Sequence, residues 1–98
     1  MAVLDESERR DTLAGLEGWA FDAGRNGIAK GFKFADFGAA FAFMTRVALE
    51  AEKADHHPEW SNVWNRVDIL LTTHSAGGVT AKDVALARTI ETISGSLP

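Results

Sequence analysis

A long apolar segment, residues 37–54, places the tightest constraint on how this chain folds. Asp36 is suited to cap the amino end of a helix there. Apolar side chains then recur at helical spacing, at Phe37, Ala40, Phe41, Met44, Val47, Ala48 and Ala51. Phe43 and Leu49 fall outside that stripe, so the helix is apolar on more than one side. Because a chain of 98 residues buries only a modest fraction of its surface, the helix predicts cover from both its own sheet and a second subunit.

Shorter elements precede this helix. The capping-box spacing of Asp5 and Glu8 predicts a helix over residues 5–16. Two strands are expected next, at residues 19–22 and 28–34. The glycines and the asparagine between them accept turn conformations, which predicts a hairpin.

The remainder of the chain repeats this pattern. Strands over residues 62–64 and 67–74 are predicted to form a second hairpin. Thr80 and Asp83 have the spacing of a capping box that begins a final helix. The order of elements predicts an α+β fold with one domain over residues 1–98. It consists of a four-stranded antiparallel sheet with three helices packed on one face.

Composition and charge exclude several classes of protein. A net charge of -4 gives no basic surface for phosphate backbones, so no direct nucleic-acid partner is expected. The longest nearly apolar stretch, Phe37 to Met44, is far shorter than the roughly 20 residues that cross a bilayer. The first ten residues contain no apolar secretory core, and the chain has no cysteine. The sequence therefore predicts a cytoplasmic protein without membrane contact.

The three histidines are the first candidates for chemistry. His56 and His57 are adjacent near the expected end of the long helix, and His74 ends the fourth predicted strand. An imidazole ordinarily titrates near ~6.5 and can give or take a proton at neutral pH. A neighbouring carboxylate, Glu52 or Asp55, could fix its tautomer. The pattern favours acid–base chemistry at a corner between helix and strand.

Simpler explanations of the same residues stay open at this level. Adjacent side chains do not face one another, which disfavours a zinc site, so no metal is expected. A polar helix carboxyl end would account for His56 and His57. The third helical position after a threonine cap would account for Asp83, and core packing would account for Trp60 and Trp64.

Longer motifs decide between these alternatives. The run E-K-A-D-H-H-P-E-W over residues 52–60 is followed by T-H at residues 73–74 and by G-V-T-A-K-D over residues 78–83. Together they closely resemble the pterin-4a-carbinolamine dehydratase family. The similarity extends back to Gly18 and Trp19 and covers nearly the whole chain. This combination is far more specific than a lone histidine pair.

The resemblance implies a hydro-lyase that removes water from 4a-hydroxytetrahydropterin. The product is the quinonoid dihydropterin, which a reductase recycles to tetrahydrobiopterin after aromatic amino-acid hydroxylation. Three histidines are implied in catalysis: those matching His56 and His74 act as general acid and base, and the one matching His57 mainly holds the pterin. No metal and no redox cofactor is implied. The pocket predicted to bind the substrate consists of His57, Glu52, Asp55, Pro58, Trp60 and Asp83.

The resemblance also concerns partners. It implies a homodimer or homotetramer. In animals, similar proteins serve as dimerisation cofactors of a homeodomain transcription factor and bind it through helices, so a protein-interaction role is the alternative function. One position departs from the family, because Trp64 stands where tyrosine is most frequent. Aromatic character is kept there, and a phenolic hydroxyl is not.

Overall fold

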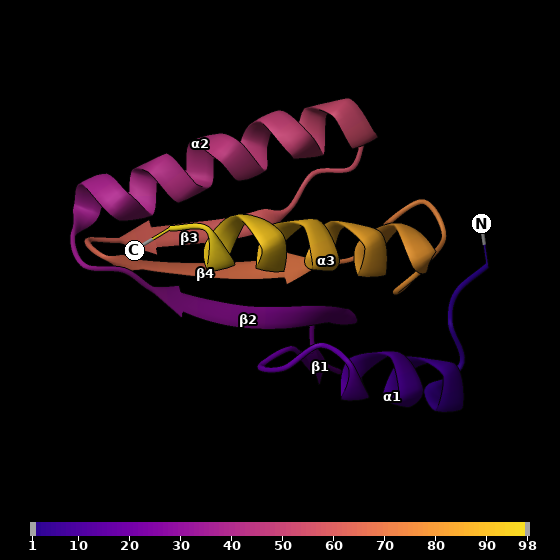
Figure 1. Cartoon of the computed structure of the whole chain (residues 1–98). Coiled ribbons are helices and arrows are strands. Elements are labelled where there is room, and N and C mark those ends of the chain that lie inside the picture. The colour runs from indigo at the N-terminus through magenta and orange to yellow at the C-terminus, as the bar shows by residue number, and fades with distance from the viewer. Residues whose placement is uncertain (1, 98) are drawn as a thin grey trace.

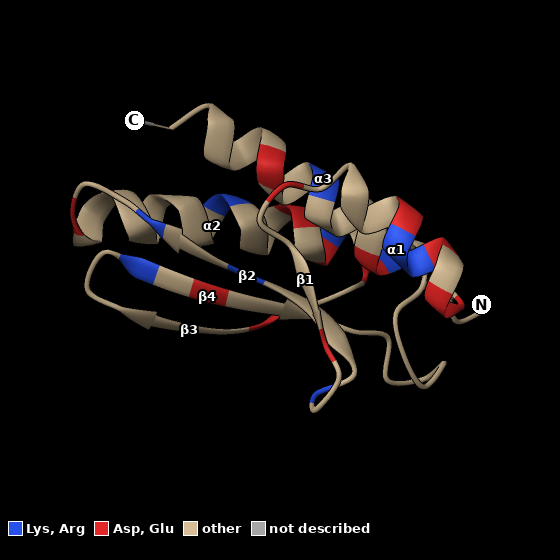
Figure 2. Ribbon diagram, turned by 90° about the horizontal axis from the view of Figure 1, so that it is seen from below, with Lys and Arg blue, Asp and Glu red and all other residues tan. Residues whose placement is uncertain are grey.

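The structure, a computed structural model that describes residues 2–97, contains three helices and a single four-stranded sheet (Figure 1). In chain order the elements are α1 (Glu6–Ala14), β1 (Ala20–Asp22), β2 (Gly27–Lys33), α2 (Phe37–Ala54), β3 (Glu59–Val63), β4 (Arg66–Leu71) and α3 (Ala81–Gly95). All neighbouring strands are antiparallel, in the order β1-β2-β4-β3. Figure 2 shows the helices layered on one face of the sheet. The predicted α+β fold is confirmed.

Helix α2 lies at the centre of the packing and begins as predicted. The Asp36 side chain accepts a hydrogen bond from the backbone N–H of Ala39 at 2.8 Å. This bond satisfies one of the free donors at the helix start. The helix packs against α3 and β4. Its fully buried side is a stripe of four residues, Ala40, Phe43, Val47 and Ala51.

The predicted apolar stripe of α2 requires a correction at two phenylalanines. Phe43, predicted to lie outside the stripe, is 0% exposed, and Phe41, predicted within it, is 57% exposed. The reason lies in the sheet. The ring of Phe43 packs on Phe32 and Phe34, with ring centres 5.0 Å and 4.8 Å apart. This contact with β2, which periodicity along α2 alone cannot predict, decides which side of the helix faces inward.

Alternate residues of β2 and β4 form the helix-facing side of the sheet. Ile28 pairs with Leu71 and Phe32 with Val67, and all four side chains are buried. This agrees with the alternation of side chains along a strand, which puts every second residue on the same face. The residues that alternate with these point to the other side of the sheet and include small or charged ones, such as Gly31 and Asp68.

The boundaries of β3 differ from the prediction. The strand begins at Glu59, three residues earlier than expected, because Glu59 and Trp60 pair with Leu70 and Ile69. Trp64, expected at the end of the strand, lies in the turn with a φ of 49°. Strand β3 therefore starts two residues after His57, with only Pro58 between them.

The ends of β4 and α1 also differ from the prediction. Strand β4 ends at Leu71, so His74 does not belong to it. His74 lies instead in a turn that the isolated bridge between Thr73 and Gly78 closes. Helix α1 ends two residues early, at Ala14, where Gly15 caps it. The other boundaries lie within about a residue of the expected ones.

Part of the surface is apolar. On α2, Phe37, Phe41 and Leu49 are between 51% and 62% exposed, and Val63 and Trp64 in the β3–β4 hairpin are 75% and 64% exposed. No helix within residues 2–97 has both the length and the hydropathy required to cross a membrane. Exposed apolar side chains clustered on one helix are typical of a surface that contacts another protein.

We expect the chain to form an assembly larger than a monomer, because the outer side of α2 remains apolar after the chain has folded. Light scattering at micromolar concentration should give a multiple of 10.6 kDa. Phe41→Glu should lower that mass, whereas the control Ser7→Glu on α1 should not. A wild-type mass near 10.6 kDa would contradict the expectation.

Candidate active site

His56 and Asp83 form the most buried polar pair among the candidate residues. Asp55 ends α2 in a left-handed conformation, with φ 51° and ψ 42°, and its N–H bonds back to the last turn. The N–H of His56 also bonds back, to the carbonyl of Ala51 at 3.1 Å. This reversal directs the His56 ring toward the start of α3. Its Nε2 lies 2.5 Å from Oδ1 of Asp83, with the two side chains 11% and 0% exposed.

Asp83 is held on both of its oxygens. Its Oδ2 accepts hydrogen bonds from the N–H of Thr80 and the hydroxyl of Thr73, both at 2.8 Å. Because Asp83 is the third residue of α3, the positive end of the helix dipole also favours its negative charge. A carboxylate can only accept, so the partner nitrogen of His56 is a donor. The neutral ring of His56 therefore carries its proton on Nε2.

The second ring nitrogen of His56, Nδ1, has no hydrogen-bond partner within residues 2–97. The hydrogen bond of its side chain is made through Nε2. Because no buried side-chain nitrogen or oxygen in residues 2–97 lacks a partner, Nδ1 must keep at least a small exposed surface. His56 and Lys82 line a groove of about 310 Å³ between α2 and α3. The lone pair on Nδ1 is thus available to an external molecule.

The other two histidines are exposed and also face carboxylates. His57 Nε2 lies 2.8 Å from Oε1 of Glu52, and the side chains are 58% and 81% exposed. His74 Nε2 lies 3.4 Å from Oε2 of Glu59, with side chains 79% and 54% exposed. Glu59 was not predicted as a site residue. Its signal is its place directly after the H-H-P motif, but only the pairing of β3 with β4 brings it to His74.

These three pairs occupy one end of the molecule. Glu59 at the start of β3 pairs with Leu70 near the end of β4, so the segments that carry the histidines meet at the same edge. Thr73, next to His74, bonds Asp83, which in turn bonds His56. In Figure 1 the end of α2, the loop after β4 and the start of α3 lie together on the right. The structure thus brings together the segments that carry the predicted histidines, and their role as a site stays a prediction.

Comparison with known proteins supplies the observation that decides the family. Residues 2–93 match the sequence model described as Pterin 4 alpha carbinolamine dehydratase. The chain belongs to this family. The resemblance inferred from the motifs is therefore confirmed. The family is one of hydro-lyases, which also confirms the expected class of enzyme.

Several individual proteins are similar to this member of the pterin-4a-carbinolamine dehydratase family. A protein of Rhizorhabdus wittichii assigned to that activity is 64% identical over 91 residues, which is 93% of this chain and 94% of the relative. One of Rhodopseudomonas palustris with the same assignment is 56% identical over 94% of this chain and 91% of the relative. Both span almost their full length in the match.

Solved structures agree in fold. The crystal structure of a transcriptional coactivator/pterin dehydratase from Brucella melitensis has a TM-score of 0.92 and 52% identity, covering 95% of this chain and 99% of that one. A pterin dehydratase-like RuBisCO assembly factor of the alpha-carboxysome has a TM-score of 0.69 at 22% identity, over 82% of this chain and 93% of that one. At that identity the second structure shares the fold alone.

The remaining residues that were predicted to bind the substrate lie at different distances from the three histidines. Asp55 and Pro58 flank the histidine pair, and Asp55 forms the helix cap. Trp60 pairs with the buried Ile69 and packs partly against the core, and it also lines the hollow on the open face of the sheet that is described below. Trp64 lies at the far end of β3 from His57. Within the single chain, the exchange of tyrosine for Trp64 therefore lies away from the histidines.

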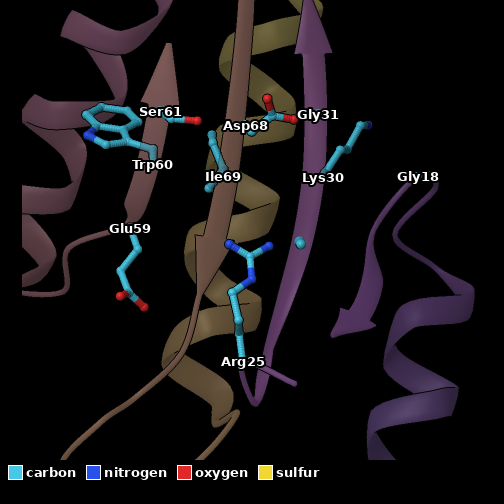
Figure 3. A pocket seen from close by; sticks show the side chains of 10 residues that line it. Gly18, Arg25, Lys30, Gly31, Glu59, Trp60, Ser61, Asp68 and Ile69 are labelled. Atoms are coloured by element: carbon cyan, nitrogen blue, oxygen red, sulfur yellow. The ribbon is translucent and has the colours of Figure 1, made fainter. Parts of the chain in front are cut away.

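A second hollow, of about 410 Å³, lies on the open face of the sheet (Figure 3). Figure 3 shows the guanidinium group of Arg25 reaching over the sheet from the β1–β2 turn. Arg25 donates a hydrogen bond to the Asp22 carboxylate at 2.8 Å, which lowers the pKa of Asp22. Of the residues in the histidine pairs, Glu59 lines this hollow. No cluster of three or more histidine, aspartate or glutamate side chains in residues 2–97 has an arrangement suited to a metal ion.

Proposed function

We propose that this chain dehydrates 4a-hydroxytetrahydropterins, as the name of its family indicates. The observation that carries the proposal is the buried pair of His56 and Asp83 beside an accessible groove. The proton on N5 is removed, and its electrons form the double bond between N5 and C4a. The bond between C4a and the hydroxyl breaks, and hydroxide leaves as water after it gains a proton. The atoms balance without an oxidant or a nucleophile, so one base and one acid suffice.

The arrangement supports a division of roles. His56 has a lone pair at Nδ1 and the carboxylate of Asp83 behind it, which stabilises the imidazolium that forms when the ring takes the N5 proton. His74, paired with Glu59 at the surface, is suited to give a proton to the leaving hydroxide. His57, held by Glu52, is assigned to hold the pterin ring.

A coupled assay tests the proposed reaction and its place in pterin recycling. Freshly generated carbinolamine is mixed with a dihydropterin reductase and NADH, so that NADH oxidation reports the quinonoid product. The proposal predicts that the purified chain shortens the lag before NADH oxidation in proportion to its concentration. A lag that does not depend on the chain would contradict the proposal.

We expect the purified protein to contain no stoichiometric zinc or iron and to keep full activity in a chelator. The adjacent spacing of His56 and His57 does not suit a shared metal, and the Nε2 atom of each already faces a carboxylate. Elemental analysis and the dehydration rate with and without EDTA check this. One equivalent of metal, together with activity lost on chelation, would overturn the expectation.

A protein-interaction role is the second candidate function. The exposed apolar side chains of α2, Phe37, Phe41 and Leu49, favour it, and the related Brucella melitensis structure carries the name of a transcriptional coactivator. Substitutions at the histidines that remove dehydration but keep the assembly would separate the two roles. If binding of a partner then persists, the interaction does not depend on the histidine site.

A further inference from the structure

Thr73 connects the turn that carries His74 with the buried pair of Asp83 and His56. Its side chain is 7% exposed. Its backbone closes the turn that carries His74, through hydrogen bonds between its N–H and the carbonyl of Gly78, and between its carbonyl and the N–H of Gly77, both at 3.0 Å. Its hydroxyl points the other way, to Asp83. The backbone and the hydroxyl of Thr73 therefore act on different parts of the site.

The hydrogen bonds around this hydroxyl have a fixed direction. Thr73 Oγ1 lies 2.8 Å from Oδ2 of Asp83 and 2.8 Å from Oγ1 of Thr80. A hydroxyl has one proton to donate, and the carboxylate can only accept, so the proton of Thr73 goes to Asp83. Thr80 must then donate to Thr73, while its oxygen accepts from the N–H of Lys82 at 3.3 Å. The hydrogen bonds therefore run from Thr80 to Thr73 and from Thr73 to Asp83, which is the final acceptor.

This direction determines what Asp83 offers to His56. With the Thr73 hydroxyl and the Thr80 N–H both on Oδ2, the free oxygen Oδ1 is directed to Nε2 of His56. Without the hydroxyl, Oδ2 would keep only one of these donors, and the buried Thr80 hydroxyl would lose its acceptor. A network in which each donor has one acceptor orients its members more strictly than an incomplete one.

We propose that Thr73 is a positioning residue that keeps His56 in the tautomer with its proton on Nε2 and its lone pair on Nδ1. Its hydroxyl acts on the imidazole of His56 through Asp83. Its effect on the rate rests on the proposed function, whereas its effect on the tautomer does not.

The test compares three variants with the wild-type protein. Thr73→Val removes the hydroxyl at nearly constant shape, and Thr73→Ser keeps it. Thr72→Val is the matched control, because Thr72 is equally buried, at 8%, and its hydroxyl bonds the carbonyl of Asn26 at 2.8 Å, outside the site. Nitrogen-15 NMR of the imidazoles reports the His56 tautomer, and dehydration kinetics report kcat and KM separately.

We expect the Nε2-protonated tautomer of His56 in the wild type, in Thr73→Ser and in Thr72→Val, and a mixture of tautomers in Thr73→Val. The kcat of Thr73→Val should fall about 10–100-fold, the loss that follows when the hydrogen-bond partner of a metal-bound histidine is removed, with KM little changed. Thr73→Ser should restore most of kcat, and Thr72→Val should keep it.

Several results would overturn the proposal. A wild-type His56 protonated mainly on Nδ1 would do so without any variant, even if Thr73→Val failed to fold. So would a Thr73→Val protein with unchanged tautomer and kcat, or an equal loss of kcat in Thr72→Val. A wild type that does not dehydrate the carbinolamine, but whose His56 tautomer still depends on Thr73, would contradict the proposed function and support the positioning role.

Discussion

Replacing His56 with alanine is expected to lower kcat for dehydration by about 10²–10⁴-fold, the usual contribution of a positioned acid or base. The reason is that a group that transfers a proton contributes only in the transition state, so its loss lowers kcat and leaves KM nearly unchanged. His74→Ala should behave in the same way. Rates from stopped-flow mixing, corrected for spontaneous water loss, measure both parameters.

His57→Ala provides the internal comparison, because a group that only holds the ring contributes equally before and during the reaction. Its loss should raise KM with little change in kcat. If His56 and His74 have separate roles, the loss in the double variant should approach the product of the single losses. If His57→Ala abolished kcat at unchanged KM, and His74→Ala left both parameters unchanged, the roles would be assigned wrongly.

Replacing Asp83 with alanine is expected to lower both activity and stability. The change removes the acceptor of three donors, the Thr73 hydroxyl, the Thr80 N–H and Nε2 of His56, all in a buried or nearly buried place. A buried donor left without a partner costs about 1–3 kcal/mol. Two of these donors, the Thr73 hydroxyl and the Thr80 N–H, are buried, so the free energy of unfolding should fall by about 2–6 kcal/mol. The kcat should fall with it because the His56 imidazolium loses its partner.

Urea unfolding followed by circular dichroism measures this loss. Glu8→Ala is the matched control, because Glu8 is the third residue of α1 and completes an exposed capping box with Asp5. Its loss should be small, since water replaces the exposed carboxylate. If Asp83→Ala were no more destabilising than Glu8→Ala, the buried network would not hold the site together.

Local signals in the sequence were sufficient for the order of elements and for the helix starts. Asp36 caps α2, and the Thr80–Asp83 capping box begins α3, because these hydrogen bonds join residues three apart in the chain. The two strand boundaries around the histidines were wrong, because they depend on pairing between β3 and β4 and on the Thr73–Gly78 bridge. The turn residues near the histidine motif do not indicate which residues of β3 and β4 pair with each other.

Asp83 shows how far sequence reasoning could extend into the site. From spacing alone, a capping role was the preferred explanation, and the resemblance implied a place in the pocket. In the structure one carboxylate oxygen completes the capping box and the other faces His56, 27 residues away, while a place for Asp83 in the substrate pocket stays a prediction. Thr73 and Glu59 were missed for the same reason, since their partners are distant in sequence. The place of Thr73 in the T-H motif, directly before His74, is the signal that could have indicated it.

Direct stopped-flow measurement of carbinolamine dehydration tests the central claim. The purified wild-type chain should accelerate the loss of water above the spontaneous rate, in proportion to protein concentration. His56→Ala, with an unchanged circular dichroism spectrum, should lose about 10²–10⁴-fold of that acceleration. A wild-type rate equal to the spontaneous rate, or a His56→Ala rate equal to that of the wild type, would contradict the account.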